Sequence, residues 1–82
     1  MKLIKLGPNI TELHFQNGVR VLVSYETPVA AYVPERGYLK SARYFSRTTA
    51  KHVREWIKQA GDKENVTTVD QYDINGLMTG ER

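Results

Sequence analysis

Apolar and polar residues alternate in two runs near the start of the chain, residues 10–15 and residues 19–25, on either side of Asn17-Gly18. Alternation with a period of two is typical of a strand that buries one face. Asn-Gly supplies the positive φ angles that a type I′ turn needs. The pattern therefore predicts an antiparallel β-hairpin over these residues, with one face in the core.

Two further apolar segments, residues 29–33 and residues 38–45, are separated by a Pro-Glu-Arg-Gly turn sequence, and we predict them as the third and fourth strands. Pro28 cannot donate a ladder hydrogen bond. The third strand is therefore expected to begin at a sheet edge or to run close to another backbone. Residues 66–72 are rich in β-prone residues, and they predict a fifth strand that pairs within the chain or with a neighbouring protomer.

The pattern changes to helical spacing in the middle of the chain, where residues 49–60 are predicted as the one helix. Thr48 or Thr49 is expected to cap its N-terminus, and Gly61 to end it. Four apolar residues occur at i, i+3, i+4 and i+7, the spacing of a buried helical stripe: Val53, Trp56, Ile57 and Ala60.

The predicted order is ββββα, or ββββαβ if residues 66–72 pair. This order indicates an α+β fold, a small antiparallel sheet of four or five strands with one helix packed on one face. Residues 1–72 are expected to form one compact domain, and residues 73–82, which are poor in large apolar side chains, a flexible C-terminal tail. A chain of 82 residues buries a thin core, and a homodimer would add burial.

Charge is distributed unevenly along the chain. Residues 36–58 contain seven of the twelve Lys and Arg residues and one acid, Glu55, which gives 7 − 1 = +6, whereas the whole chain carries +3. Three interpretations are open for this basic block: a surface for nucleic acid, a surface for an acidic protein, or a solvated face without a specific partner. The acidic residues 62–73 could also fold over it.

Basic side chains interleaved with aromatic ones are typical of nucleic-acid binding, because cations contact phosphates and rings stack on exposed bases. In this interpretation Tyr44 is the stacking residue. The predicted contacts to nucleic acid, or to the alternative acidic protein surface, are Lys40, Arg43, Tyr44, Arg47, Lys51, Arg54 and Lys58.

Sequence motifs for catalysis are weak, and we predict that the protein is not an enzyme and needs no cofactor. There is no cysteine, no glycine-rich phosphate loop, and the two histidines, His14 and His52, lack metal-ligand spacing. A hydrolase that uses Ser46 or Thr48 with His52 is the remaining catalytic alternative. Hydroxyl residues at the start of a helix are more often caps.

No apolar run approaches the roughly 20 residues of a membrane span. The N-terminal Met-Lys-Leu-Ile-Lys-Leu is too short for the apolar region of a signal peptide. The sequence therefore predicts a cytoplasmic protein with no membrane partner.

Two motifs resemble a family of small uncharacterised bacteriophage and prophage proteins. They are S-Y-x-T-P-V-A-A-Y at residues 24–32 and S-x-T-T-x-K-H-h-x-x-W, where h is apolar, at residues 46–56. The resemblance covers about residues 10–60. It implies an accessory gene product in the cytoplasm of a bacterial host, where host takeover or evasion of defence is a typical role. The alternative function in that setting is inhibition of a host enzyme or defence system.

The resemblance also implies a structural role for the shared residues. The Thr-Thr-x-Lys-His sequence would open a helix, with His52 close enough to bond the end of a strand. Thr27-Pro28 would mark the start of a strand.

Overall fold

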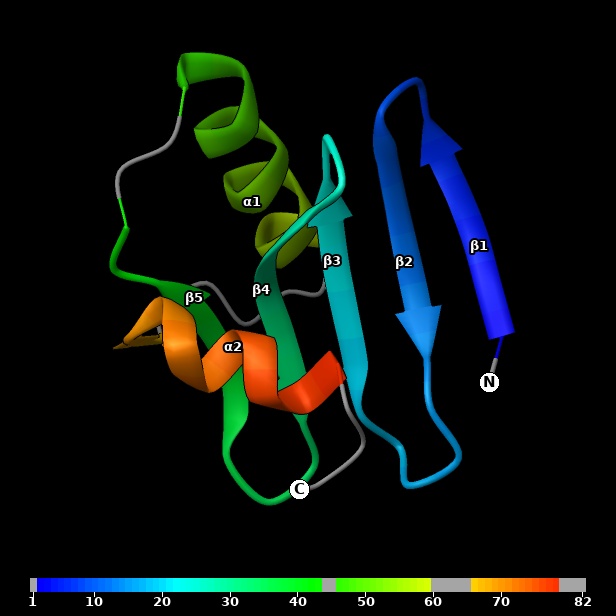
Figure 1. Cartoon of the computed structure of the whole chain (residues 1–82), viewed down its shortest axis with the longest axis vertical. Coiled ribbons are helices and arrows are strands. Elements are labelled where there is room, and N and C mark those ends of the chain that lie inside the picture. The colour runs from blue at the N-terminus through cyan, green and yellow to red at the C-terminus, as the bar shows by residue number, and fades with distance from the viewer. Residues whose placement is uncertain (1, 44–45, 60–65, 79–82) are drawn as a thin grey trace.

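The computed structural model describes residues 2–43, 46–59 and 66–78 of the chain (Figure 1). Its elements form one mixed sheet of six strands, in the order β1-β2-β3-β4-β5-β6, together with two helices. In chain order these are β1 (Lys2–Gly7), β2 (Ile10–His14), β3 (Arg20–Ser24), β4 (Thr27–Val33), β5 (Gly37–Ser41), α1 (Arg47–Gln59), β6 (Val66–Val69) and α2 (Gln71–Met78).

The first five strands form an antiparallel meander, and β6 then pairs with β5 in parallel. Parallel neighbours require a crossover connection, and α1 lies in that connection. The α+β class predicted from sequence is confirmed. The predicted architecture of four or five antiparallel strands with one helix is corrected to six strands, one of them parallel, and two helices.

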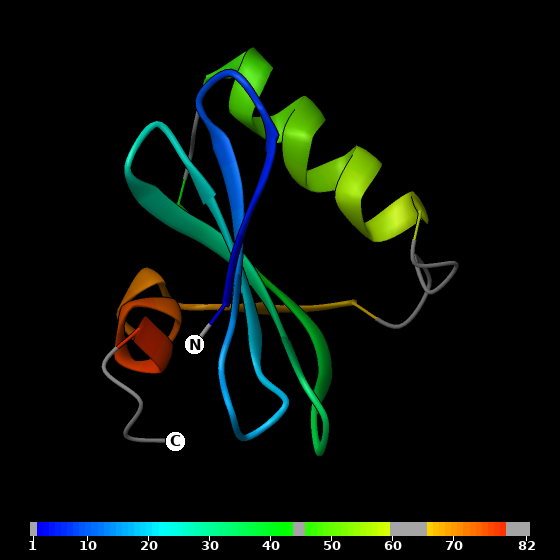
Figure 2. The same ribbon diagram turned by 90° about the vertical axis from the view of Figure 1, so that its right-hand side faces the viewer.

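The helices cover opposite faces of the sheet, as the edge-on view of Figure 2 shows. Each face carries its own apolar cluster. On the α1 side the buried members are Leu22, Val29, Ala30, Tyr38, Val53, Trp56 and Ile57. On the α2 side they are Val19, Val21, Ala31, Leu39, Ile74 and Leu77. Neighbouring residues of β3 and β5, and Ala30 and Ala31 of β4, therefore serve different layers, as the period of two requires, whereas Val29 shares a layer with Ala30 at a bulge in β4.

The hairpin predicted around Asn17-Gly18 is present, but its turn differs from type I′. Gly18 has φ of 87°, whereas Asn17 is not among the residues with positive φ. The Gly18 N–H donates to the Phe15 carbonyl at 3.1 Å, and the Phe15 N–H donates to the Val19 carbonyl at 2.9 Å. This is the pattern of a type I turn followed by a glycine bulge, the next most common hairpin solution.

The third predicted strand is not at a sheet edge. It is β4, which lies between β3 and β5, and Pro28 pairs with Val23 beside a bulge in β4, where Val29 is the extra residue. The Pro28 carbonyl accepts a hydrogen bond of 2.7 Å from the Nε2 atom of Gln71. A bulge is the setting in which a sheet tolerates a residue without an N–H.

The predicted helix begins earlier than expected, at Arg47, and Ser46 caps it instead of Thr48 or Thr49. The Ser46 Oγ atom accepts the N–H of Thr49 at 3.3 Å, the bond that an N-cap makes to the third helical residue. Residues 60 and 61, which were expected to end the helix, lie outside the described residues.

The predicted tail boundary at residue 73 is wrong, because residues 73–78 belong to α2. Ile74 is fully buried and Leu77 is 3% exposed, both against the sheet. The predicted fifth strand is shorter than residues 66–72, since it ends at Val69 and the chain turns into α2 at Asp70. Residues 79–82 lie outside the described residues.

Candidate functional site

The outward side of α1 carries four cationic side chains, all exposed and spaced at i, i+4, i+7 and i+11. This set, which we call the cationic stripe, consists of Arg47, Lys51, Arg54 and Lys58. At 3.6 residues per turn these positions stay within a narrow sector of the helix surface. Eleven residues at 1.5 Å each give the stripe a length of about 16 Å.

The opposite side of α1 fixes the direction of the stripe. Val53, Trp56 and Ile57 are 8%, 8% and 4% exposed, and they pack against β3, β4 and β5. The Trp56 ring meets the Tyr38 ring edge-on, with centroids 5.5 Å apart. Because these anchors hold α1 in one rotation, the cationic stripe points away from the sheet.

The cationic stripe is electrostatically unfavourable for the helix itself. Arg47, Lys51, Arg54 and Lys58 form three neighbouring like-charge pairs, each of which destabilises a helix by roughly 0.2–0.5 kcal/mol. The first turn contains no acidic residue to complement the helix dipole. Within the described part of the chain, none of the four is within ion-pair distance of a carboxylate. Glu55 is the one acid of α1, and the four cations outnumber it, so the stripe contributes little to the stability of the fold.

Two more predicted residues lie beside the stripe, at the end of β5. Lys40 is exposed on the α1 side of the sheet, because it pairs with Ala30 of the α1-side cluster. Arg43 follows the strand, and its N–H donates to the Ser41 Oγ at 3.1 Å. Lys40, Arg43 and Arg54 line one groove between α1 and the sheet. Tyr44, the predicted stacking residue, lies outside the described residues.

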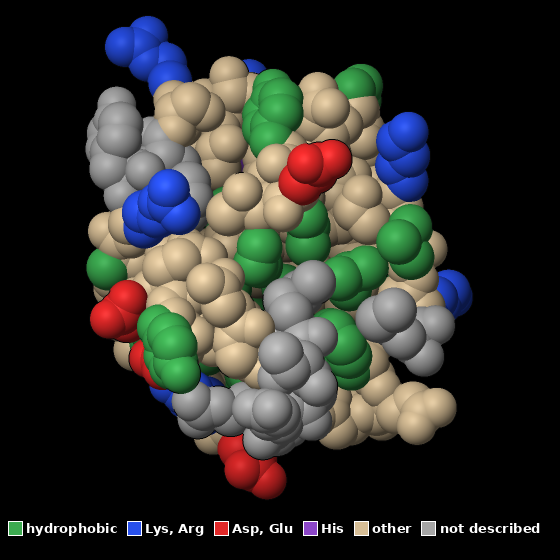
Figure 3. Space-filling model, in the orientation of Figure 1, with side chains coloured by type: hydrophobic (Ala, Val, Ile, Leu, Met, Phe, Trp, Pro, Cys, Tyr) green, Lys and Arg blue, Asp and Glu red, His purple; other side chains and the backbone are tan. Residues whose placement is uncertain are grey.

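The face covered by α2 differs in charge. In Figure 3, which looks onto that face, Lys and Arg side chains lie apart near the rim and Asp and Glu lie among them. Asp73, one of the acids considered as a cover for the basic block, belongs to α2 and so lies across the sheet from the cationic stripe. Asp70, another of these acids, follows β6 and lines a second pocket together with Arg43, at the end of the basic block. Residues 62 and 64 lie outside the described residues.

Two residues of the catalytic alternative, Ser46 and His52, belong to a hydrogen-bond cluster with Ser24 and Thr49. His52 Nδ1 lies 3.2 Å from Ser24 Oγ at the end of β3, as the helix-opening interpretation predicted. Ser24 Oγ also lies 3.2 Å from Thr49 Oγ1, and Ser46 Oγ donates to Thr49 Oγ1 at 3.3 Å. The hydroxyl beside His52 is thus that of Ser24, which is 2% exposed and is not one of the nucleophiles of that alternative. Thr48 is exposed and takes no part in this cluster.

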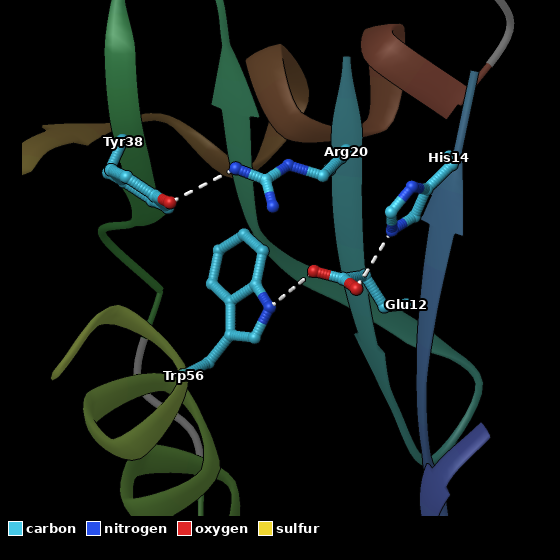
Figure 4. Close-up of polar contacts among 5 residues, drawn as sticks. All are labelled: Glu12, His14, Arg20, Tyr38 and Trp56. Atoms are coloured by element: carbon cyan, nitrogen blue, oxygen red, sulfur yellow. Dashed lines mark hydrogen bonds and ion pairs between the residues drawn. The ribbon is translucent and has the colours of Figure 1, made fainter. Parts of the chain in front are cut away.

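A second polar network joins α1 to the first hairpin (Figure 4). Glu12 accepts hydrogen bonds of 2.8 Å from Trp56 Nε1 and from His14 Nε2. Burial raises the pKa of Glu12, but the bonds from His14 and Trp56 and the positive charges of His14 and Arg20 outweigh that effect, and the pKa lies below its ordinary value of 4.5. Glu12 thus holds the indole end of Trp56 as a carboxylate.

Sequence reasoning found the cations but not the apolar surface between them. That surface comes from Val29, Ala50 and Val66, which lie on three different elements. Among the described residues, no group of three or more His, Asp and Glu side chains could hold a metal ion. Neither described helix has the length and apolar character that crossing a membrane requires.

Comparison with known proteins gives one family. The model of a family of unknown function, DUF8033, matches residues 1–76. No curated protein and no solved structure matches the chain.

Proposed function

The chain belongs to DUF8033, a family of unknown function, and we propose that this member binds nucleic acid through the phosphate backbone. The observation that carries the proposal is the cationic stripe: four exposed cations on the outward side of α1, against one acid in that helix, Glu55. Lys40 and Arg43 extend the same surface across the end of β5.

The mechanism is charge neutralisation. Each Lys or Arg that contacts a phosphate releases condensed counterions, so that log K falls linearly with log salt by about 0.9 per contact on duplex DNA and about 0.7 on single strands. Up to six cations are in place, which gives a slope of up to about −5 on duplex DNA. The protein acts as a binding protein and catalyses no reaction.

The composition of the cationic stripe favours nucleic acid over an acidic protein surface. Protein interfaces obtain most of their affinity from a few buried aromatic or Arg anchors that fill pockets. The outward side of α1 has no aromatic residue, since Trp56 lies in the core. A row of exposed cations suits a polyanion, where affinity comes from the number of phosphate contacts.

The proposed setting is a bacterial cell infected by a phage, as the resemblance of residues 24–32 and 46–56 implies. In that setting the nucleic acid is that of the phage or its host. The alternative, an inhibitor of a host enzyme, would bind one protein stoichiometrically and keep it after nuclease treatment.

Salt-titrated binding of labelled oligonucleotides tests the proposal. Lys51→Gln should lower the slope of log K against log salt by about one unit. Lys5→Gln is the matched control, because Lys5 is also exposed but lies on β1 at the far edge of the sheet. The proposal fails if the protein does not bind at about 50 mM salt, or if both variants change the slope equally.

A further inference from the structure

A groove of about 540 Å³ lies next to the cationic stripe, between α1 and the β5–β6 end of the sheet. Its volume is within the range of about 300–1,000 Å³ that ligand sites occupy. Arg54 belongs both to the stripe and to the groove, so the two surfaces are continuous.

The floor of the groove is aliphatic. Val29, Val53 and Ile57 are 1%, 8% and 4% exposed, and the half-buried Val66 completes the floor from β6. Ala50, whose side chain is small and exposed, forms part of the helical wall. The shallow floor therefore offers apolar contact to an occupant.

The rim of the groove is cationic. Lys40 projects from β5, Arg43 follows that strand, and Arg54 approaches from α1. Apart from these three, the polar side chain among the described lining residues is that of Ser41, whose Oγ accepts the N–H of Arg43. The described lining thus offers an occupant an apolar floor and positive charge on both walls. It contains few hydrogen-bonding groups that could select one base over another.

We propose that this groove takes an unstacked base of a single-stranded nucleic acid, whose flanking phosphates contact Lys40, Arg43 and Arg54. This inference rests on the proposed function and names the form of the nucleic acid. The base supplies an apolar face for the aliphatic floor, and the strand supplies an anion on either side of it. A strand held along the cationic stripe passes Arg54 and so brings its next base to the groove.

Two consequences follow for binding preference. Bases in a duplex are stacked and paired, and flipping one costs a few kcal/mol, so the protein should prefer single strands. Since the groove offers few groups that read base edges, the preference for sequence should be weak, as is common in proteins that bind single strands by contact with base faces.

The test compares oligonucleotides of about 12 nucleotides, within the site sizes of small single-strand binders, in three forms: a single strand, its duplex, and an abasic strand with the same phosphates. We expect the single strand to bind about fivefold or more tightly than the abasic strand. DNA and RNA versions of each form show which sugar the surface accepts. All forms are measured at the same salt concentration, because phosphate contacts dominate affinity.

Variants at the groove wall locate the effect. Ala50→Leu fills the groove from an exposed helical position and should remove the preference for the single strand over the abasic strand. Thr48→Leu is the matched control, because Thr48 is exposed on the other flank of the same helical turn. Ala42→Leu, a second filling change, acts from the end of β5, so a defect in α1 cannot explain a loss in both. Thermal unfolding confirms that each variant is folded.

The outcomes separate this inference from the proposed function. If the single strand and the abasic strand bind equally while Lys51→Gln still lowers the salt slope, the groove inference is wrong and phosphate binding stands. If Ala50→Leu and Ala42→Leu leave the preference unchanged, the base lies elsewhere and the inference is also overturned. If no form binds at low salt, both proposals fail.

Discussion

Reversing the charge of Arg47 should stabilise the fold and weaken binding at the same time. Arg47 is the first residue of α1, and Ser46 caps the helix directly before it. A cation in this turn opposes the helix dipole, and it also repels Lys51 one turn later. Arg47→Glu changes the sign of both interactions.

The expected magnitude comes from these two interactions. An acid in the first turn typically stabilises a helix by about 0.3–1 kcal/mol, and a Glu-to-Lys pair at i, i+4 stabilises it by about 0.2–0.5 kcal/mol. With Arg47 in place, both interactions are unfavourable instead. Allowing for solvent screening at an exposed site, we expect a gain of about 1 kcal/mol. In a domain of this size that raises Tm by about 4–8 °C.

Binding should change in the opposite direction. Loss of one phosphate contact lowers the salt slope by about one unit, which at about 50 mM salt corresponds to roughly tenfold weaker binding. Thermal unfolding by circular dichroism and fluorescence anisotropy with a labelled oligonucleotide measure the two effects on the same preparation. Thr48→Glu is the matched control, since it adds an acid to the same turn but removes no cation from the stripe.

Two results would refute the reasoning. If Arg47→Glu lowers Tm while Thr48→Glu raises it, Arg47 makes a stabilising contact and the cationic stripe is not a cost to the fold. Arg47→Glu changes the net charge by −2 and Thr48→Glu by −1. If the two variants weaken the binding free energy in that same ratio, affinity follows net charge alone, and the position of the cations on α1 is irrelevant.

Three further changes test the packing around the site. Because the pKa of Glu12 lies below 4.5, its carboxylate stabilises the fold above that pH and the stabilisation is lost as the pH falls through the lower folded-state pKa. Trp56→Phe removes one hydrogen bond to that carboxylate, so it should lower the free energy of unfolding by about 1.5–3 kcal/mol at pH 7, as measured by urea unfolding. It should also reduce the loss of stability at acid pH. An unchanged dependence of stability on pH would contradict this role of Glu12. Ile74→Ala should lower the free energy of unfolding by about 2–5 kcal/mol, whereas Asn75→Ala, at an exposed position, should change it little. Equal effects of the two variants would show that α2 does not pack on the sheet as described. Glu26 has a φ of 71°, a left-handed backbone conformation that glycine adopts without strain. Glu26→Gly should therefore raise the free energy of unfolding by about 1 kcal/mol. A lower free energy of unfolding would mean that the turn is not strained.

The elements predicted correctly are those specified by local pattern. The hairpin on either side of residues 17–18 and the helix anchored by Trp56 each carry a complete periodic signal over consecutive residues. The elements missed depend on partners elsewhere in the chain. In β1, Leu3 is 63% exposed, and the strand exists as an edge paired with β2. In α2, Ile74 and Leu77 are the buried residues among the side chains that the structure describes, and Gly76 lowers the intrinsic helix propensity, so the stability of α2 comes from packing on the sheet.

The candidate site shows the same division. Helical spacing alone was sufficient to align Lys51, Arg54 and Lys58 once the core side of α1 was known. Arg47 joins them because α1 begins two residues before the predicted helix. The groove could not be predicted, because Val29 and Val66 meet there through tertiary structure. Its position required the parallel pairing of β5 and β6, which an antiparallel prediction excludes.

That pairing explains why a groove exists next to the cationic stripe. A parallel β6 can follow β5 only after a crossover, and α1, which lies in that crossover, packs over β3 and β4 through Leu22 and Ala30. Among the described residues, α1 therefore leaves the β5–β6 end of the sheet partly open on this side, and Lys40 is exposed there. The side of α1 that carries Ala50 and Arg54 becomes one wall and the last two strands the other. The same connection that completes the sheet thus places an apolar floor beside a row of cations. Variants that destabilise the pairing of β6 with β5 should therefore reduce the preference for single strands more than they reduce the salt-dependent binding to phosphates.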